Sequence, residues 1–162
     1  MEARRQELIA LVLQAFKDVT REGGVSWSQT FVMDDYGSDA ELAQAAARDR
    51  ELDWIELSRQ GPWNYEYAMW GFLDAISARY YLAASLLLDL ETGRSAHPDL
   101  LLTYGPQKES WSLLDDHQRA VVAMYMRWKR DIAGLEQSRM EHRNWTRALQ
   151  AGWDQYPPPD SK

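Results

Sequence analysis

The stretch YYLAASLLLDLE, residues 80–91, decides the fold class, because it holds the longest apolar run of the chain. Gly93 follows it, and a glycine just beyond an apolar segment is a common helix stop. The sequence therefore predicts a buried central helix over residues 80–91, preceded by a turn at residues 74–78. Because two adjacent tyrosines favour β structure, a short strand over residues 79–82 is the alternative.

Helix starts on both sides of this segment are predicted by a repeated pair of polar residues. In a capping box, one side chain accepts a hydrogen bond from a backbone N–H at the helix start, and the side chain three positions later reaches back. The spacing occurs three times, at Ser26/Gln29, Ser38/Glu41 and Asp115/Gln118. These pairs predict helices over residues 27–36, 39–50 and 116–132.

The remaining segments complete an all-α prediction. An apolar stripe with helical spacing runs from Leu8 to Val19 and is stopped at Gly23, and further helices are predicted over residues 64–73 and 135–151. Residues 52–63 have no period and are predicted to be a loop or one irregular turn, and the connection over residues 94–110 is predicted to carry one turn at 100–102. We expect a compact single-domain bundle of six or seven helices over residues 1–155, then a mobile proline-rich tail over residues 156–162.

Composition excludes several classes of protein. The chain has 162 residues, which is the size of one domain, and it contains no cysteine, which excludes disulfides and thiol chemistry. The net charge of −7 argues against nucleic-acid binding, because contacts to phosphates need clustered Lys and Arg. The longest apolar run is shorter than the roughly 20 residues that span a bilayer, and no signal peptide is recognised. We therefore expect a cytoplasmic protein without a membrane partner.

Motifs for metal, cofactor and nucleophile chemistry are missing from the sequence. Helical metal sites use a carboxylate three residues before a histidine, but that position before the three histidines holds Arg94, Leu114 and Arg139. There is no nucleophile elbow and no glycine-rich phosphate loop. We expect no metal and no cofactor.

Carboxylates are the one plentiful type of catalytic side chain. Asp74 lies at a predicted turn and is followed five residues later by Arg79, so we expect these two residues to form a structural ion pair. The alternative is catalytic, with Asp74 acting together with a second carboxylate.

Several short motifs resemble those of a family of small uncharacterised bacterial proteins. The family pattern is close to F-L-D-x-x-x-x-R-[FY]-Y-L-P-A, and residues 72–84 read FLDAISARYYLAA, with Ala83 where the family usually has proline. Further similar motifs at residues 25–37, 53–54, 114–122 and 148–153 keep the same order. The resemblance covers residues 25–153. It implies a fold and no chemistry, because the family is one of unknown function.

Charge is distributed unevenly along the chain. Residues 34–56 hold eight acids against two arginines, whereas residues 119–147 hold seven bases against three acids. One interpretation is that the two regions face each other and neutralise each other inside the fold, or that they face solvent. The other is that the acidic region binds a basic protein partner, such as a toxin, with tryptophans as anchors. The predicted partner-binding residues are Trp27, Asp34, Asp35, Glu41, Asp49, Asp53 and Trp54; Trp63 and Trp111 are further candidates for a partner surface.

These observations predict a function without catalysis. Small size, acidic charge and many aromatic residues fit a protein-binding module of the immunity- or antitoxin-like kind. The alternative is a small carboxylate-dependent hydrolase or transferase. A concave pocket with a strongly perturbed acid would favour the enzyme, and an acidic patch with exposed tryptophans would favour the binding protein.

Overall fold

The structure, a computed structural model, describes residues 1–49, 53–60 and 67–159. Within these ranges the protein is all-α and has no strand, which confirms the predicted fold class. The described part of the chain contains eight α-helices, one of them a single turn, and three short 3-10 helices. The α-helices are α1 (Glu2–Ala15), α2 (Trp27–Asp34), α3 (Asp39–Arg48), α4 (Trp54–Gln60), α5 (Ala75–Thr92), α6 (Asp99–Leu102), α7 (Asp116–Leu135) and α8 (Arg139–Gln150); the 3-10 helices are η1 (Tyr67–Phe72), η2 (Glu109–Trp111) and η3 (Trp153–Gln155).

The central helix of the fold is α5, as the sequence predicted. Every side chain over residues 80–90 is buried, and α1, α4 and η2 pack against the helix. From α7, the side chains of Tyr125 and Lys129 contact Asp89 of α5. It begins earlier than predicted, because the Asp74 carboxylate accepts the N–H of Ser77 at 2.8 Å and caps the helix. The predicted turn at residues 74–78 and the alternative strand are therefore wrong. Gly93 ends the helix with a left-handed φ of 73°, which glycine adopts without strain.

All three predicted capping boxes are present. At the starts of α2, α3 and α7, both reciprocal hydrogen bonds of the box form. The helix ends differ from the prediction: α2 ends two residues early and α7 extends three residues further. The capping pairs thus predicted the first residues of these helices more accurately than the sequence pattern predicted their last residues.

Two segments of the prediction are wrong in type. The first is the predicted loop, where Trp54–Gln60 forms α4; Asp53 caps this helix by accepting the N–H of Glu56 at 2.8 Å. The second is the predicted helix over residues 64–73, which is a 3-10 helix over Tyr67–Phe72, residues 64–66 lying outside the described part. A helix of two turns has too few residues to show a period, and this is why the pattern missed α4.

Both ends of the chain also depart from the prediction. The first helix stops at Ala15, well before Gly23. Tyr156, the first residue of the predicted tail, is half-buried, and its hydroxyl accepts a hydrogen bond from Arg119 Nη1 at 3.1 Å. The packed part of the chain therefore extends one residue beyond the predicted boundary.

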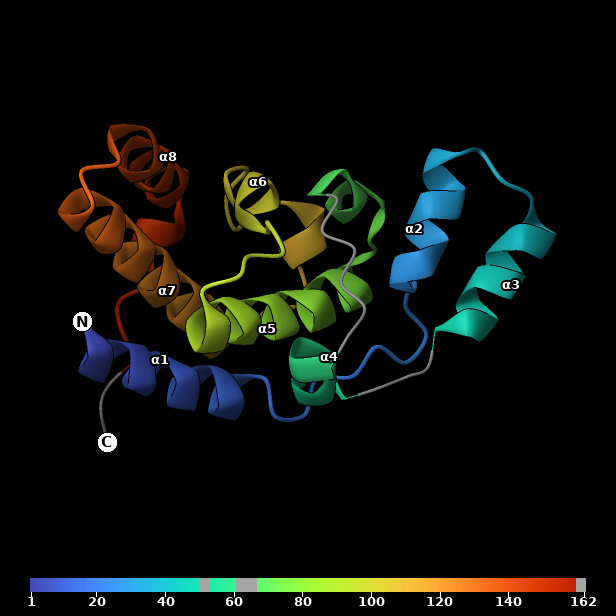
Figure 1. The fold of residues 1–162 in the computed structure, drawn as a ribbon, viewed down its shortest axis with the longest axis horizontal. Helices are drawn as coiled ribbons and strands as arrows, with labels where there is room; N and C mark the ends of the chain where they lie inside the picture. Colours follow the sequence, from blue (N-terminus) through green and yellow to red (C-terminus); the bar gives the residue numbers. More distant parts are fainter. Residues whose placement is uncertain (50–52, 61–66, 160–162) are drawn as a thin grey trace.

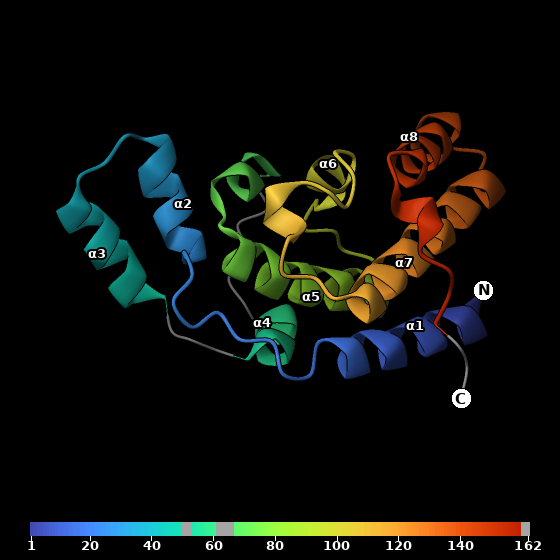
Figure 2. The ribbon, with the colours of Figure 1, turned by 180° about the vertical axis from the view of Figure 1, so that it is seen from behind.

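The elements form an elongated arrangement (Figure 1). The α2–α3 pair lies at one end, α7 and α8 lie at the other, and α5 lies between them, with α1 running along one side. The view from behind shows the same order (Figure 2). No helix in the described ranges is both long and apolar enough to cross a membrane.

Candidate functional site

The turn between α2 and α3 holds the most exposed large apolar side chain of the described residues. Tyr36 is 96% exposed and has a left-handed φ of 54°. Gly37 follows it, and a Cβ there would lie 2.4 Å from Val32 Cγ1, so the turn requires glycine at that position. The two capped helices on either side hold this turn in place.

Acidic side chains surround this tyrosine. Asp34, Asp35 and Asp39 are exposed, and none of them has an ion pair in the described part of the chain. Glu41 has a partner: its carboxylate accepts the backbone N–H of Ser38 at 2.7 Å, and this hydrogen bond is the main cause that lowers its pKa. We call the set Asp34, Asp35, Tyr36, Asp39 and Glu41 the acidic tip.

Two of the predicted partner-binding acids hold the backbone instead. Asp49 accepts the N–H of Ser28 at 2.9 Å and also its hydroxyl, which ties the end of α3 to the start of α2. Asp53 is the cap of α4. Both carboxylates therefore have a structural partner, unlike those of Asp34, Asp35 and Asp39 in the described part of the chain.

The prediction that Trp27 and Trp54 are exposed anchors is wrong. Trp54 is 1% exposed, and its indole N–H donates to the Phe16 carbonyl at 2.9 Å. Trp27 is 8% exposed and packs edge-on against Trp70, with ring centroids 5.7 Å apart. Trp111, the further candidate, is fully buried, and Trp63 lies outside the described residues.

The sequence analysis missed Tyr36 as the exposed aromatic residue. The sequence did contain a signal for it. Tyr36 follows two acids and precedes a glycine and a capping serine, a pattern that predicts a turn at the surface.

The acidic tip and the basic residues of α8 do not face each other. They lie at opposite ends of the molecule in both views (Figures 1 and 2). The bases of α7 pair nearby: Lys129 binds Asp89 at 2.9 Å, and Arg130 binds Asp131 at 2.9 Å. Among the described residues, α8 therefore does not neutralise the acids of the tip, which face solvent.

Asp74 and Arg79 each hold backbone groups. The two carboxylate oxygens of Asp74 accept the N–H groups of Ser77 and Val25, at 2.8 and 3.2 Å. Arg79 donates from Nη1 to the Leu113 carbonyl at 3.1 Å. Both roles are structural, although neither bond is the predicted ion pair.

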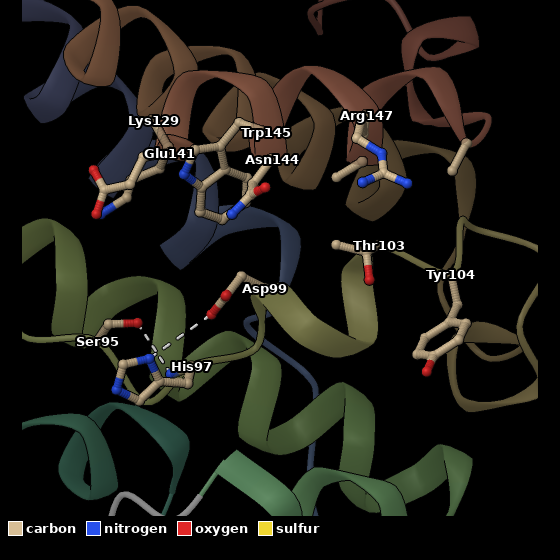
Figure 3. Close-up of a pocket in the computed structure, with 12 residues that line it drawn as sticks. Ser95, His97, Asp99, Thr103, Tyr104, Lys129, Glu141, Asn144, Trp145 and Arg147 are labelled. Atoms are coloured by element: carbon tan, nitrogen blue, oxygen red, sulfur yellow. Dashed lines mark hydrogen bonds and ion pairs between the residues drawn. The ribbon is translucent and has the colours of Figure 1, made fainter. Parts of the chain in front are cut away.

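A cleft of about 680 Å³ opens between α6 and α8 (Figure 3). One wall is the loop from Ser95 through α6 to Tyr104, and the other wall is the face of α8 that carries Glu141, Asn144 and Arg147. These walls come from parts of the chain about 45 residues apart, so no sequence motif announced the cleft. The predicted single turn at residues 100–102 is α6.

Buried hydrogen bonds fix the α6 wall of this cleft. Trp70 donates its indole N–H to the Ala96 carbonyl at 2.6 Å, and Trp153 donates to the Leu102 carbonyl at 2.9 Å. Between these anchors His97 is held at a φ of 55°, a strained value for a residue with a side chain. These contacts within the protein therefore hold the α6 wall in place.

A buried polar cluster lies behind the cleft. Asp89 is 4% exposed and accepts hydrogen bonds from the Tyr125 hydroxyl and from Lys129 Nζ, and Lys129 also lines the cleft. Burial, followed by the charge of Asp89, raises the pKa of Tyr125 well above its ordinary value. Among the described residues, no group of three or more His, Asp or Glu side chains could hold a metal ion.

Comparisons with known proteins give a family without an assigned function. No curated protein and no solved structure matches the chain. The model of a family of unknown function, DUF6714, matches residues 4–157, nearly the whole length described. The expected kinship with an uncharacterised family is confirmed at this level, and the chain belongs to the DUF6714 family.

Proposed function

We propose that the protein is a non-catalytic, protein-binding module of the cytoplasm, and that its acidic tip docks a basic protein. The observation that carries this proposal is Tyr36, which is 96% exposed and is surrounded by Asp34, Asp35 and Asp39, three exposed acids that have no ion pair within residues 1–49, 53–60 and 67–159. An immunity- or antitoxin-like protein that covers a basic surface of a toxin would use such a tip.

The conformational free-energy cost of the Tyr36 backbone supports the role of this residue as an anchor. A non-glycine residue at positive φ costs of order 1–3 kcal/mol, and an aromatic ring left in water recovers none of it within the fold. Tyrosine is enriched at protein interfaces, because it buries a large rigid area at a low cost in side-chain entropy. The strained turn is therefore understandable as a preformed anchor.

The surrounding acids supply the charge complementarity. Unpaired carboxylates at an interface rim attract a cationic surface and raise the association rate, more than they raise the final affinity. The enzyme alternative has less support, because both oxygens of Asp74 are taken by backbone N–H groups.

Site-specific crosslinking in the cells of origin tests the proposal. The photo-crosslinking residue p-benzoylphenylalanine replaces Tyr36 in one chain and Tyr104, which is 71% exposed, in a control chain. We expect one discrete protein adduct from position 36 that position 104 does not give. Equal adducts from both positions, or none from position 36, would contradict the proposal.

Binding of the captured protein is then measured with purified components. Tyr36→Ala should weaken binding at least tenfold, or about 1.4 kcal/mol. Replacing Asp34, Asp35 and Asp39 by Asn should slow association at low salt and leave the melting temperature unchanged. The matched control replaces the exposed acids Glu7, Glu22 and Glu136 by Gln, which removes the same charge away from the tip. An equal loss of rate in this control would assign the effect to net charge alone.

A further inference from the structure

We infer that the cleft between α6 and α8 binds a small zwitterion of the amino-acid or short-peptide class. This site is separate from the acidic tip, which lies at the opposite end of the molecule (Figures 1 and 3). The inference rests on the charges that line the cleft, on which of them already have partners, and on the rigidity of its wall.

One side of the cleft presents a free cation. Arg147 extends from α8 on the side where Thr103 and Tyr104 lie (Figure 3). It is exposed and has neither an ion pair nor a side-chain hydrogen bond in the described part of the chain. A planar guanidinium with its five N–H donors unused is suited to a carboxylate, which it can bind through two parallel hydrogen bonds.

The other side presents two carboxylates, those of Glu141 and Asp99. Glu141 is exposed and has no partner in the described part of the chain. Asp99 lies on the opposite wall, and its carboxylate is 3.9 Å from His97 Nδ1, a distance that is too long for a hydrogen bond. Lys129 also lies on this side, but its ammonium group forms an ion pair with the buried carboxylate of Asp89, with 2.9 Å between Nζ and Oδ2. An ammonium group is the ligand chemistry that fits this side.

Size and lining restrict the ligand further. A volume of about 680 Å³ lies within the usual range of small-molecule sites, roughly 300–1,000 Å³. The apolar part of the lining comes from the half-buried Trp145 and the buried Ala148 of α8, from Ala151 directly after this helix, and from the exposed ring of Tyr104. These side chains provide a surface for the side chain of an amino acid or short peptide.

The cleft is also prepared for binding. The Trp70 and Trp153 hydrogen bonds fix the α6 wall, and at the far end Gly105 approaches the Ala151 backbone so closely that a Cβ would lie 2.4 Å from its carbonyl oxygen. A ligand therefore orders little of the protein when it binds, and the usual entropic cost of ordering loops is avoided. In the bound state, the ligand carboxylate lies on Arg147 and its ammonium lies between Asp99 and Glu141.

Calorimetric titration of the full chain tests this inference. The probes are the twenty free L-amino acids and a set of dipeptides, followed by the amide and the N-acetyl derivative of the tightest binder. We expect saturable binding that weakens at least tenfold when either charge of the probe is removed. No saturable binding by any probe, or binding of either derivative as tight as that of the free amino acid, would overturn the inference.

Single variants of the lining residues then test which side chain binds each charged group of the ligand. Arg147→Gln should weaken the binding of the free amino acid at least tenfold. It should leave the binding of the amide derivative unchanged, because the amide has no carboxylate that could pair with Arg147. Glu141→Gln should weaken the binding of the free amino acid and leave the binding of the N-acetyl derivative unchanged, because that derivative has no ammonium group. The control is Arg143→Gln, an exposed arginine one turn away on α8 that does not line the cleft. If this control weakened binding as much as Arg147→Gln, the charge of the helix and not the cleft would explain the binding. Tyr36→Ala should bind the probe like the wild type, which separates this test from that of the acidic tip.

Discussion

Replacing Asp89 by Asn should destabilise the protein by about 2–4 kcal/mol. The Asp89 side chain is 3% exposed and accepts hydrogen bonds from Tyr125 and Lys129. Removing one member of a fully buried ion pair costs roughly 3–5 kcal/mol, because the remaining charge is left uncompensated. Here Lys129 is 25% exposed and reaches water through the cleft, which lowers the cost, whereas the weakened hydrogen bond to Tyr125 adds about 1 kcal/mol.

Urea unfolding followed by far-UV circular dichroism measures this change. The midpoint should fall while the slope m stays constant, since the mutation does not alter the surface exposed on unfolding. Lys129→Met, which leaves Asp89 charged and buried, should also be costly, and the double variant should cost clearly less than the sum of the two.

A matched carboxylate provides the control. Asp131 is also paired, with Arg4 at 3.1 Å and Arg130 at 2.9 Å, but its side chain is 35% exposed. Asp131→Asn should therefore cost less than about 1 kcal/mol. If Asp89→Asn cost no more than Asp131→Asn, or if the double variant were additive, the assignment of Asp89 as a buried, coupled charge would be refuted.

Three further predictions concern the core, the capping and the buried tyrosines. Leu86→Asp should abolish cooperative folding, because Leu86 is fully buried and an unpaired charge there costs several kcal/mol; a soluble variant with a cooperative melt would contradict the placement of α5. Ser38→Ala should lower the free energy of unfolding by about 1 kcal/mol. Because the pKa of Glu41 is lowered in the folded state, its contribution is present above its ordinary value of 4.5 and is lost as the pH falls below it, so the variant should show a smaller loss of stability on acidification. The pKa values of Tyr81 and Tyr125 are raised, mainly by burial, so the stability they confer is present below pH 10 and declines above it; tyrosinate absorbance at 295 nm should show two residues that ionise only as the chain unfolds.

Local chemistry explains which parts of the fold the sequence predicted. The three capping boxes depend on residues within four positions of each other, and all three formed as predicted. The same chemistry also marked α4, since Asp53 precedes Glu56 by three residues, but the breaker at Gly61–Pro62 and the missing period outweighed that signal. A longer helix would have shown its apolar face.

Burial and concave sites were the parts that sequence could not predict. Trp54 lies at a helix start, where a side chain is as often exposed as buried, and the contact with Phe16 that buries it comes from 38 residues away. The cleft likewise combines the segment around His97 with α8, and only packing of the whole chain brings them together. Asp34, Asp35 and Glu41, which the sequence analysis proposed as partner-binding residues, lie together at the acidic tip, because helix ends at a turn are near one another in space.

The separation of charge described above makes the molecule an electric dipole. Asp34, Asp35 and Asp39 lie beyond one end of α5, and the arginines of α8 lie beyond its other end, with a helix of 18 residues, about 27 Å long, between them. That span exceeds the Debye length of about 8 Å at physiological salt, so each end presents its own local field and the two do not cancel. A charged body that comes within about a Debye length of one end, from the side of the long axis, would exert a torque on the protein as well as a force. The molecule would rotate until the end of opposite sign faces that body before the two surfaces touch.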